Sequence, residues 1–228
     1  MRIQKIRWSK NFAYAIGLIA ADGYLSKDGR HISLVSKDID QLKNFAKALG
    51  LNNKISLHSS GYNPKGRYYH IQFGNAKFYK FLILIGLSVH KTENIKALKI
   101  PDRYFVHFLR GFLDGDGSTY SYWDPRWKSS FQLYTVFISL SLAYLEWMQK
   151  KIELLFGLKG TIRKTKLRSN RYMYRLEYAK KNSIELIKYL YPVGQEIVFL
   201  KRKKFKIDQS LGIIRRQAEV VKLAYTQD

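Results

Sequence analysis

Two short segments of this chain share one arrangement of apolar and polar positions. Residues 15–23 have the sequence AIGLIAADG, and residues 109–117 have the sequence LRGFLDGDG. In each segment the apolar positions follow helical spacing, and the pattern stops at an aspartate followed by a glycine. The chain therefore contains two predicted helices that carry Asp22 and Asp116 at their C-terminal ends.

The elements predicted after each motif repeat as well. A strand over residues 32–35 precedes a helix over 39–49 that closes at Gly50, and a strand over 136–138 precedes a helix over 142–155 that closes at Gly157. A hairpin and a last helix follow, at 55–58, 68–73 and 75–85 in the first half and at 161–165, 173–178 and 182–191 in the second. With one more strand after each Asp-Gly, the prediction is an α+β fold of two pseudo-symmetric halves, each a four-stranded antiparallel sheet backed by helices.

The two predicted halves span residues 1–97 and 98–209. The connection between them contains Pro101 and Asp102, which suit the start of the second motif helix. Residues 210–228 have no counterpart in the first half, and their apolar positions fit either a terminal helix or a partly frayed tail.

Small residues share one face of each motif helix, namely Ala13, Gly17, Ala20 and Ala21 in the first and Gly111 and Gly115 in the second. Such faces let helix backbones approach closely, so we expect these two helices to pack on each other. Pairing about a two-fold axis puts Asp22 and Asp116 side by side, where two like charges are costly without a cation. Oxygen ligands favour magnesium, calcium or manganese. For either helix alone, a simpler interpretation is an aspartate ahead of a glycine cap.

Charge narrows the function further. The chain has 41 Lys and Arg residues against 17 Asp and Glu residues, a formal charge of +24. The positive charges on such a surface repel one another unless a bound polyanion compensates them, and nucleic acid is the obvious candidate. A merely basic protein, or one that docks on anionic lipid, is the alternative.

Several classes of protein are excluded by what the sequence lacks. Without cysteine there is no disulfide framework, thiol nucleophile or cysteine-ligated zinc site. The absence of cysteine is compatible with a reducing cellular compartment. The first 23 residues imitate a secretory signal, but the same pattern recurs at 109–117, so we interpret the first copy as structure. No stretch reaches the roughly 20 apolar residues that span a bilayer. We expect an intracellular protein, cytoplasmic or organellar, with no membrane partner.

The doubled motif resembles that of the LAGLIDADG homing endonucleases in their single-chain form, over approximately residues 12–207. The resemblance implies an αββαββα fold for each half and a saddle of two antiparallel sheets in the DNA major groove. It implies an intron-encoded monomer that makes a double-strand break in a long DNA site. Asp22 and Asp116 would be the catalytic metal ligands, with the backbone carbonyls of Ala21 and Gly115 near the metal. The implied cofactor is Mg²⁺, with Mn²⁺ able to replace it and Ca²⁺ binding without efficient cleavage.

Further positions of the family pattern can be located in this sequence. The first copy has Ala20 where many members have an earlier acid, but that position is not the metal ligand. Asp114 fills the slot of an earlier acid in the second copy, where we expect a structural role. Lys91 and Lys203 resemble the basic residues that members place near the scissile phosphates, although a solvated charge run is an equal alternative. Ser36 and Ser139 stand at the end of the second strand of each half, where some members position a water.

Strand alternation and basic loops indicate which side chains would face DNA. The expected contacts in the first half are Arg30, His31, Ser33, Ser56, His58, Lys65, Arg67, Tyr68, His70 and Gln72. The expected contacts in the second half are Tyr120, Tyr122, Arg126, Lys128, Gln132, Arg163, Thr165, Lys166, Arg168, Arg171, Met173, Arg175 and Glu177. For any one of these residues, a solvated side chain on an exposed strand is the alternative.

The sequence thus predicts a monomeric, magnesium-dependent, site-specific DNA endonuclease whose unlike halves recognise a non-palindromic duplex. Two alternatives use the same scaffold without cutting DNA: an intron RNA maturase, and a DNA-binding protein that has lost the metal. A third, a basic structural nucleic-acid or ribosome-associated protein, explains the charge but not the doubled carboxylate.

Overall fold

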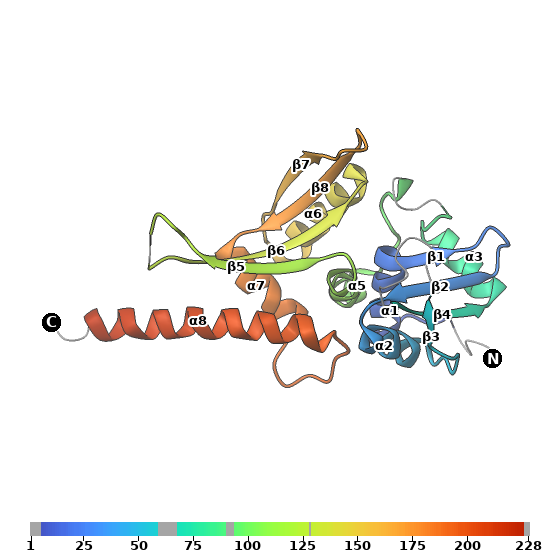
Figure 1. The fold of residues 1–228 in the computed structure, drawn as a ribbon, viewed down its shortest axis with the longest axis horizontal. Coiled ribbons are helices and arrows are strands. Elements are labelled where there is room, and N and C mark those ends of the chain that lie inside the picture. Colours follow the sequence, from blue (N-terminus) through green and yellow to red (C-terminus); the bar gives the residue numbers. More distant parts are fainter. Residues whose placement is uncertain (1–5, 59–67, 90–93, 128, 226–228) are drawn as a thin grey trace.

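The computed structural model describes residues 6–58, 68–89, 94–127 and 129–225 (Figure 1). Four of the residues singled out above, Lys65, Arg67, Lys91 and Lys128, lie outside these ranges. None of the helices in the described ranges combines the length and apolar character that crossing a bilayer requires.

The two halves repeat the same order of elements. The first half contains α1 (Lys10–Asp22), β1 (Gly23–Leu25), β2 (His31–Ser36), α2 (Ile39–Leu49), β3 (Ser56–His58), β4 (Tyr68–Gly74) and α3 (Ala76–Leu84). The second half contains α5 (Asp102–Asp114), β5 (Ser118–Trp123), β6 (Phe131–Ser139), α6 (Leu142–Phe156), β7 (Thr161–Lys166), β8 (Tyr172–Tyr178) and α7 (Lys180–Leu190). A last helix, α8 (Lys201–Tyr225), follows. The predicted α+β fold with two αββαββα halves is confirmed.

Each half has one four-stranded antiparallel sheet, with strand order β1-β2-β4-β3 in the first and β5-β6-β8-β7 in the second. Side chains alternate across each strand, so one face of the sheet packs on the helices. Ile32 and Leu34 on β2 are fully buried, whereas Ser33 between them pairs with Gln72 on the opposite face. This alternation leaves one polar face on each sheet.

The helix ends follow the turn chemistry of the sequence. Ser9 begins α1 and accepts a hydrogen bond from the backbone N–H of Phe12, as helix N-caps do. Helices α2 and α6 end at Gly50 and Gly157, both in the left-handed conformation with φ of 64° and 68°. A glycine is favoured there because it has no β-carbon to clash.

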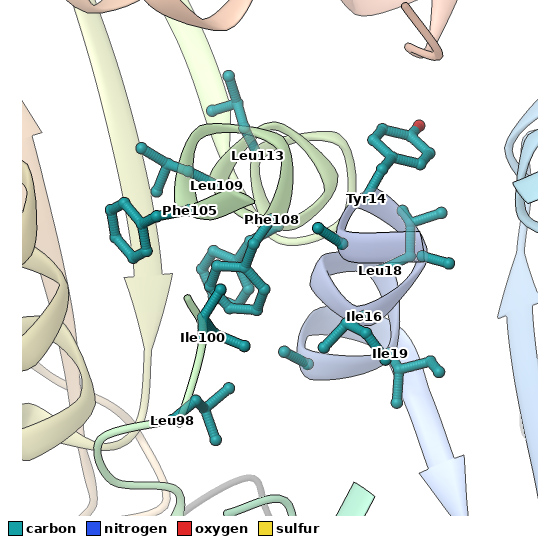
Figure 2. Packing of buried hydrophobic residues seen from close by; sticks show 14 of the residues in the cluster. Tyr14, Ile16, Leu18, Ile19, Leu98, Ile100, Phe105, Phe108, Leu109 and Leu113 are labelled. Atoms are coloured by element: carbon teal, nitrogen blue, oxygen red, sulfur yellow. The ribbon is translucent and has the colours of Figure 1, made fainter. Parts of the chain in front are cut away.

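Helices α1 and α5 pack against each other through their glycines. A β-carbon on Gly17 would lie 2.1 Å from the carbonyl oxygen of Phe108, and one on Gly111 would lie 2.0 Å from that of Tyr14. Neither position can hold a larger residue without moving a backbone. Figure 2 shows the apolar side chains around this crossing, including Leu18 from α1 and Phe108 from α5. The predicted pairing of the motif helices is therefore confirmed.

The C-terminal segment joins both halves. Asn44 of α2 donates a hydrogen bond from Nδ2 to the carbonyl oxygen of Phe199 (2.8 Å), and Arg202 pairs with Asp38 at the start of α2 (2.7 Å). Helix α8 then runs beside β5 (Figure 1), and the expected tail boundary between residues 209 and 210 falls within it.

Candidate functional site

The ends of the two motif helices meet at one place. Asp22 is the last residue of α1, and Asp116 lies two residues beyond the end of α5. A β-carbon added to Gly115 would lie 2.4 Å from the β-carbon of Ala21 and 3.0 Å from Oδ2 of Asp22. The charges of Asp22 and Asp116 both favour the protonated form of a third residue, Lys203, so both carboxylates act on the same ammonium group. The structure therefore brings the two motif ends together.

Lys203, near the start of α8, reaches back to the end of α5. Its ammonium group donates hydrogen bonds to the carbonyl oxygens of Leu113 (2.7 Å), Gly115 (2.8 Å) and Gly117 (2.7 Å). A cation at a helix C-terminus satisfies the last carbonyls and opposes the negative end of the dipole. Burial lowers the pKa of Lys203, while the nearby carboxylates oppose that shift. Of the four basic residues at positions 201–204, this one lies against the motif.

Asp114 forms the buried centre of a hydrogen-bond network. Its carboxylate accepts from the hydroxyls of Tyr14 (2.7 Å) and Tyr191 (3.3 Å) and from the backbone N–H of Leu200 (2.7 Å). Burial raises the pKa of Asp114, and the hydrogen bonds from Tyr14 and Leu200 oppose that rise. The network ties α1 and α5 to the segment that precedes α8, which is consistent with the structural role expected for this acid.

Arg110, one turn earlier on α5, is also buried. Its guanidinium donates to the carbonyl oxygens of Val198 (2.9 Å) and Leu190 (2.9 Å) and lies 3.0 Å from Nδ1 of His107. Burial, followed by the charge of Arg110, lowers the pKa of His107 to about 4. His107 therefore stays neutral and accepts this hydrogen bond near pH 7.

In the first half, Gln41 connects Ser36 to Asp22. The amide nitrogen of Gln41 lies 3.2 Å from Oδ2 of Asp22, and its amide oxygen accepts from the hydroxyl of Ser36 (2.8 Å). Gln41 is 3% exposed. Sequence reasoning missed it; the available signal was a glutamine on the apolar face of α2, three residues after the N-cap Asp38.

The second half has a different arrangement at the same positions. Ser139 accepts from the backbone N–H of Ser141 (3.1 Å), as Ser36 does from that of Asp38 (3.1 Å). Three residues after the N-cap Ser141 stands Tyr144 in place of glutamine. Its buried hydroxyl has no hydrogen-bond partner in the described part of the chain, and burial raises its pKa, followed by the charge of Asp116. A cavity of about 190 Å³ is lined by Asp116, Ser139 and Tyr144, and also by Met173.

The polar face of the first sheet carries most of the contacts expected there. By register, Ser33, Ser56, His58, Tyr68, His70 and Gln72 lie on this face. The rings of His58 and His70 are 5.4 Å apart, and the ammonium of Lys37 lies 5.1 Å from the ring centre of Tyr68. Tyr24, 55% exposed and paired with Ser33, shares the face and was missed. Arg30 precedes β2 and His31 is its first residue, and both contact Asp28.

The polar face of the second sheet carries a tyrosine stack. The rings of Tyr120 and Tyr134 are 5.0 Å apart and nearly parallel, and the ring of Tyr122 lies 6.2 Å from that of Tyr134. Glu177 accepts from both Arg163 (3.0 Å) and Arg175 (3.1 Å). These two arginines therefore already have a partner on the sheet, and contacting a base would require them to exchange it. Tyr134 was missed because the predicted strand covered only residues 136–138, whereas β6 begins at Phe131.

The remaining expected contacts lie at the periphery of this sheet. Gln132 donates to the hydroxyl of Ser130 (2.8 Å), and Arg126 forms a two-point contact with Asp124 (3.1 and 3.0 Å). Thr165 and Lys166 are exposed at the end of β7, and Arg168 and Arg171 are exposed around the turn to β8.

In the described part of the chain, the acidic side chains that could hold a cation at the motif ends are Asp22 and Asp116. No group of three or more His, Cys, Asp or Glu side chains that could hold a metal occurs among the residues that the structure describes. A divalent cation at Asp22 and Asp116 would therefore complete its shell with main-chain carbonyls and with oxygens of water or phosphate, which suits Mg²⁺.

Comparison with known proteins agrees with this architecture. Residues 9–86 match the family model of a LAGLIDADG-like domain. An uncharacterized protein of Methanocaldococcus jannaschii is 32% identical over 116 residues, which cover 48% of this chain. The match covers only 39% of the length of that relative.

Solved structures of similar fold include two homing endonucleases and one WhiA domain. I-WcaI bound to its DNA recognition sequence has a TM-score of 0.59, 16% identity, and coverage of 89% of this chain and 88% of that one. I-DmoI in complex with DNA and Ca has a TM-score of 0.53, 16% identity, and coverage of 81% and 91%. The N-terminal LAGLIDADG domain of DUF199/WhiA has a TM-score of 0.53, 19% identity, and coverage of 91% of each chain. At these identities the likeness shows the fold.

Proposed function

Because this chain carries a LAGLIDADG-like domain and has the fold of the single-chain, two-motif LAGLIDADG homing endonucleases, we propose that it is a site-specific DNA endonuclease. It would make a double-strand break in a long, non-palindromic duplex by metal-dependent phosphodiester hydrolysis, acting as a monomer. The observation that carries the proposal is the meeting of the two motif ends, with two aspartates acting on one ammonium group.

The proposed metal ligands are Asp22 and Asp116, with the main-chain carbonyls of Ala21 and Gly115 nearby. Two carboxylates with few other protein oxygens fit Mg²⁺, which keeps waters and takes phosphate oxygens, and Mn²⁺ would substitute. When bound, such a cation activates water and stabilises the leaving oxygen of a phosphodiester. The carbonyl oxygen of Gly115 already accepts from Lys203, so it would share its lone pairs.

The other side chains would orient these ligands. Gln41 donates to Asp22 and would fix the direction of that carboxylate, while Ser36 fixes Gln41. Lys203 would stabilise negative charge at the motif ends from its carbonyl cradle. Outer partners of this kind tune a metal site by orienting its ligands. Ser139 would act on the side of Asp116, across the cavity that both line.

The two polar sheet faces would bind the major groove of DNA. The first face offers histidine, serine and glutamine, and the second offers stacked tyrosines with arginines held by Glu177. Different donor and acceptor sets select different bases. Unlike faces therefore imply unlike half-sites.

The test is selection of cleaved sites from a randomised duplex library with Mg²⁺, followed by Asp22→Asn and Asp116→Asn on the selected site. We expect each variant to lose cutting and to keep binding, since asparagine retains the shape but not the charge. A double variant that cuts at the wild-type rate would refute the proposed site.

A second candidate is a DNA-binding protein on this scaffold that does not cut. It is favoured by one observation: the ammonium of Lys203 is bound to the carbonyl of Gly115, where a metal would compete with it. The LAGLIDADG domain of WhiA has a similar fold. If wild-type protein binds a selected duplex and never cuts it with Mg²⁺ or Mn²⁺, this candidate or a maturase replaces the nuclease.

A further inference from the structure

A groove of about 890 Å³ separates α8 from the edge strand β5, and it is open to solvent. Thr119, Tyr120 and Ser121 line the strand side, and residues of α8 between Lys206 and Arg216 line the other. Of the sheet residues that line the groove, Tyr120 belongs to the tyrosine stack on the polar face, whereas Thr119, Ser121 and Phe131 lie on the opposite face by register. The groove therefore lies along the edge of the second sheet, next to its polar face. Figure 1 shows α8 running beside β5 and the hairpin that β5 forms with β6.

The groove is positively charged. Lys206 and Arg216 are exposed and line it. At a spacing of ten residues they are nearly three helical turns apart along α8 and about 80° apart around its axis. Within the described residues neither of them forms an ion pair. The acid of the groove, Asp208, is neutralised by Lys204, whose ammonium lies 2.5 Å from it. Two uncompensated cations thus face the space between helix and strand.

The helix that carries these cations is fixed in place. Arg202 pairs with Asp38 at its start, the hydroxyl of Ser210 lies 3.0 Å from that of Ser121, and Gln217 donates to the carbonyl oxygen of Ser129 (2.6 Å). Ile207 between these anchors is fully buried. Because α8 is already ordered along β5, a ligand in the groove loses little affinity to ordering the helix.

We propose that this groove binds the phosphodiester backbone of duplex DNA at the flank of the site contacted by the second sheet. This inference rests on the proposed DNA-binding function and adds a third contact surface to the two sheets. The cationic side chains of Lys206 and Arg216, beside hydroxyl groups, can bind phosphate oxygens. Such contacts position a duplex without reading its sequence. A duplex is favoured over single-stranded RNA because the groove adjoins the sheet face that is proposed to bind duplex DNA.

The test compares Lys206→Gln/Arg216→Gln with Lys201→Gln/Arg215→Gln. The control pair removes the same two charges from exposed positions of α8 that do not line the groove. Binding to a random-sequence duplex is measured with Ca²⁺ over a range of salt concentrations. For two lost phosphate contacts, the slope of log K against log salt falls in magnitude by about 1.8 in the first pair. The control pair should keep the wild-type slope.

Hydroxyl-radical footprints on a selected target give the second readout. We expect the first pair to lose protection at one flank only, on the side of the second half. Equal slopes and footprints for wild type and the first pair would overturn the proposal, as would equal losses in both pairs. The proposal would also be overturned if the first pair bound RNA more weakly than wild type but bound duplex DNA equally well.

These outcomes separate this proposal from the nuclease proposal. If wild-type protein binds DNA and never cuts it, the nuclease proposal is refuted. The groove proposal is then still tested by the salt dependence of DNA binding in the two variant pairs. A wild-type protein that cuts, with no difference between the two pairs, refutes the groove and leaves the nuclease.

Discussion

Gly17 and Gly111 face each other where α1 and α5 cross, so closely that a β-carbon on Gly111 would lie 3.2 Å from the α-carbon of Gly17. The nearest obstacles to either β-carbon are carbonyl oxygens of the opposite helix. Backbone cannot rotate aside as a side chain can, so the crossing sets the distance between the motif ends and hence between Asp22 and Asp116.

Gly111→Ala is expected to lower the free energy of unfolding by about 1–3 kcal/mol, because the methyl group must push two backbones apart. Gly212→Ala, in α8 with nothing within 4 Å of the added carbon, is the control and should raise stability by roughly 0.5–1 kcal/mol. Urea unfolding followed by circular dichroism measures both. Equal midpoints for the two variants would contradict the close crossing.

Tyr14→Phe and Tyr144→Phe form a matched pair of buried tyrosines. The hydroxyl of Tyr14 donates to Asp114, so its removal should cost about 1.5–3 kcal/mol. The hydroxyl of Tyr144 has no such partner within the described ranges, so its removal should leave stability within about 0.5 kcal/mol or raise it. Thermal and urea unfolding of the two variants side by side provide the comparison. A larger loss for Tyr144→Phe would mean that its hydroxyl is bonded in solution.

His107 makes stability depend on pH in a defined window. Its pKa in the folded state is about 4, below the ordinary value of 6.5 expected when unfolded, because burial and Arg110 oppose its charge. As pH falls from 6.5 to 4, His107 becomes protonated in the unfolded chain but stays neutral in the folded chain, so the free energy of unfolding decreases. The contribution is roughly 2–3 kcal/mol.

His107→Gln should reduce this loss, since glutamine does not titrate and its amide oxygen can still accept from Arg110. Wild-type protein measured in parallel is the reference. The measurement is the free energy of unfolding at a series of pH values between 4 and 7. Parallel curves for wild type and His107→Gln would be the contrary result.

Gln41→Leu tests whether Asp22 needs its amide partner. Leucine keeps most of the volume but cannot donate to the carboxylate, so the cutting rate on a selected site should fall about 10–100-fold. The Mg²⁺ concentration for half-maximal rate should rise, while DNA binding in Ca²⁺ is retained. Gln149→Leu is the control, because that amide donates to the carbonyl of Gly160 instead. Equal cutting rates for Gln41→Leu and Gln149→Leu would count against this role, because only Gln41 contacts Asp22.

Local pattern was enough to predict the order of elements in the two halves, but not the length of β6 or the start of α8 at Lys201. Gly50 and Gly157 close their helices because their left-handed φ suits glycine, and the apolar and polar alternation of β2 and β4 follows the sheet period of two. The small residues on α1 and α5 likewise predict close pairing from sequence alone.

The polar network depended on tertiary structure. The partners of Asp114 come from residues 77 to 100 positions away, so no local pattern could reveal them. Lys203 differs from Lys201 and Arg202 only in which side of α8 it occupies. Glutamine is a polar residue type that is usually exposed, and Gln41 is buried because α2 packs against the end of α1. A polar residue at an apolar helix position is the signal to look for.

The glycine crossing also has a consequence for biosynthesis. Nearly all of α1 is enclosed in the finished protein, but α5, which covers one side of it, begins about 80 residues after α1 ends. At a translation rate of about 5–20 residues per second, α1 emerges from the ribosome roughly 4–16 s before its partner. During that interval its small-residue stripe is open to water and to other nascent chains. The core of the first half is therefore complete only after the second motif helix has been made.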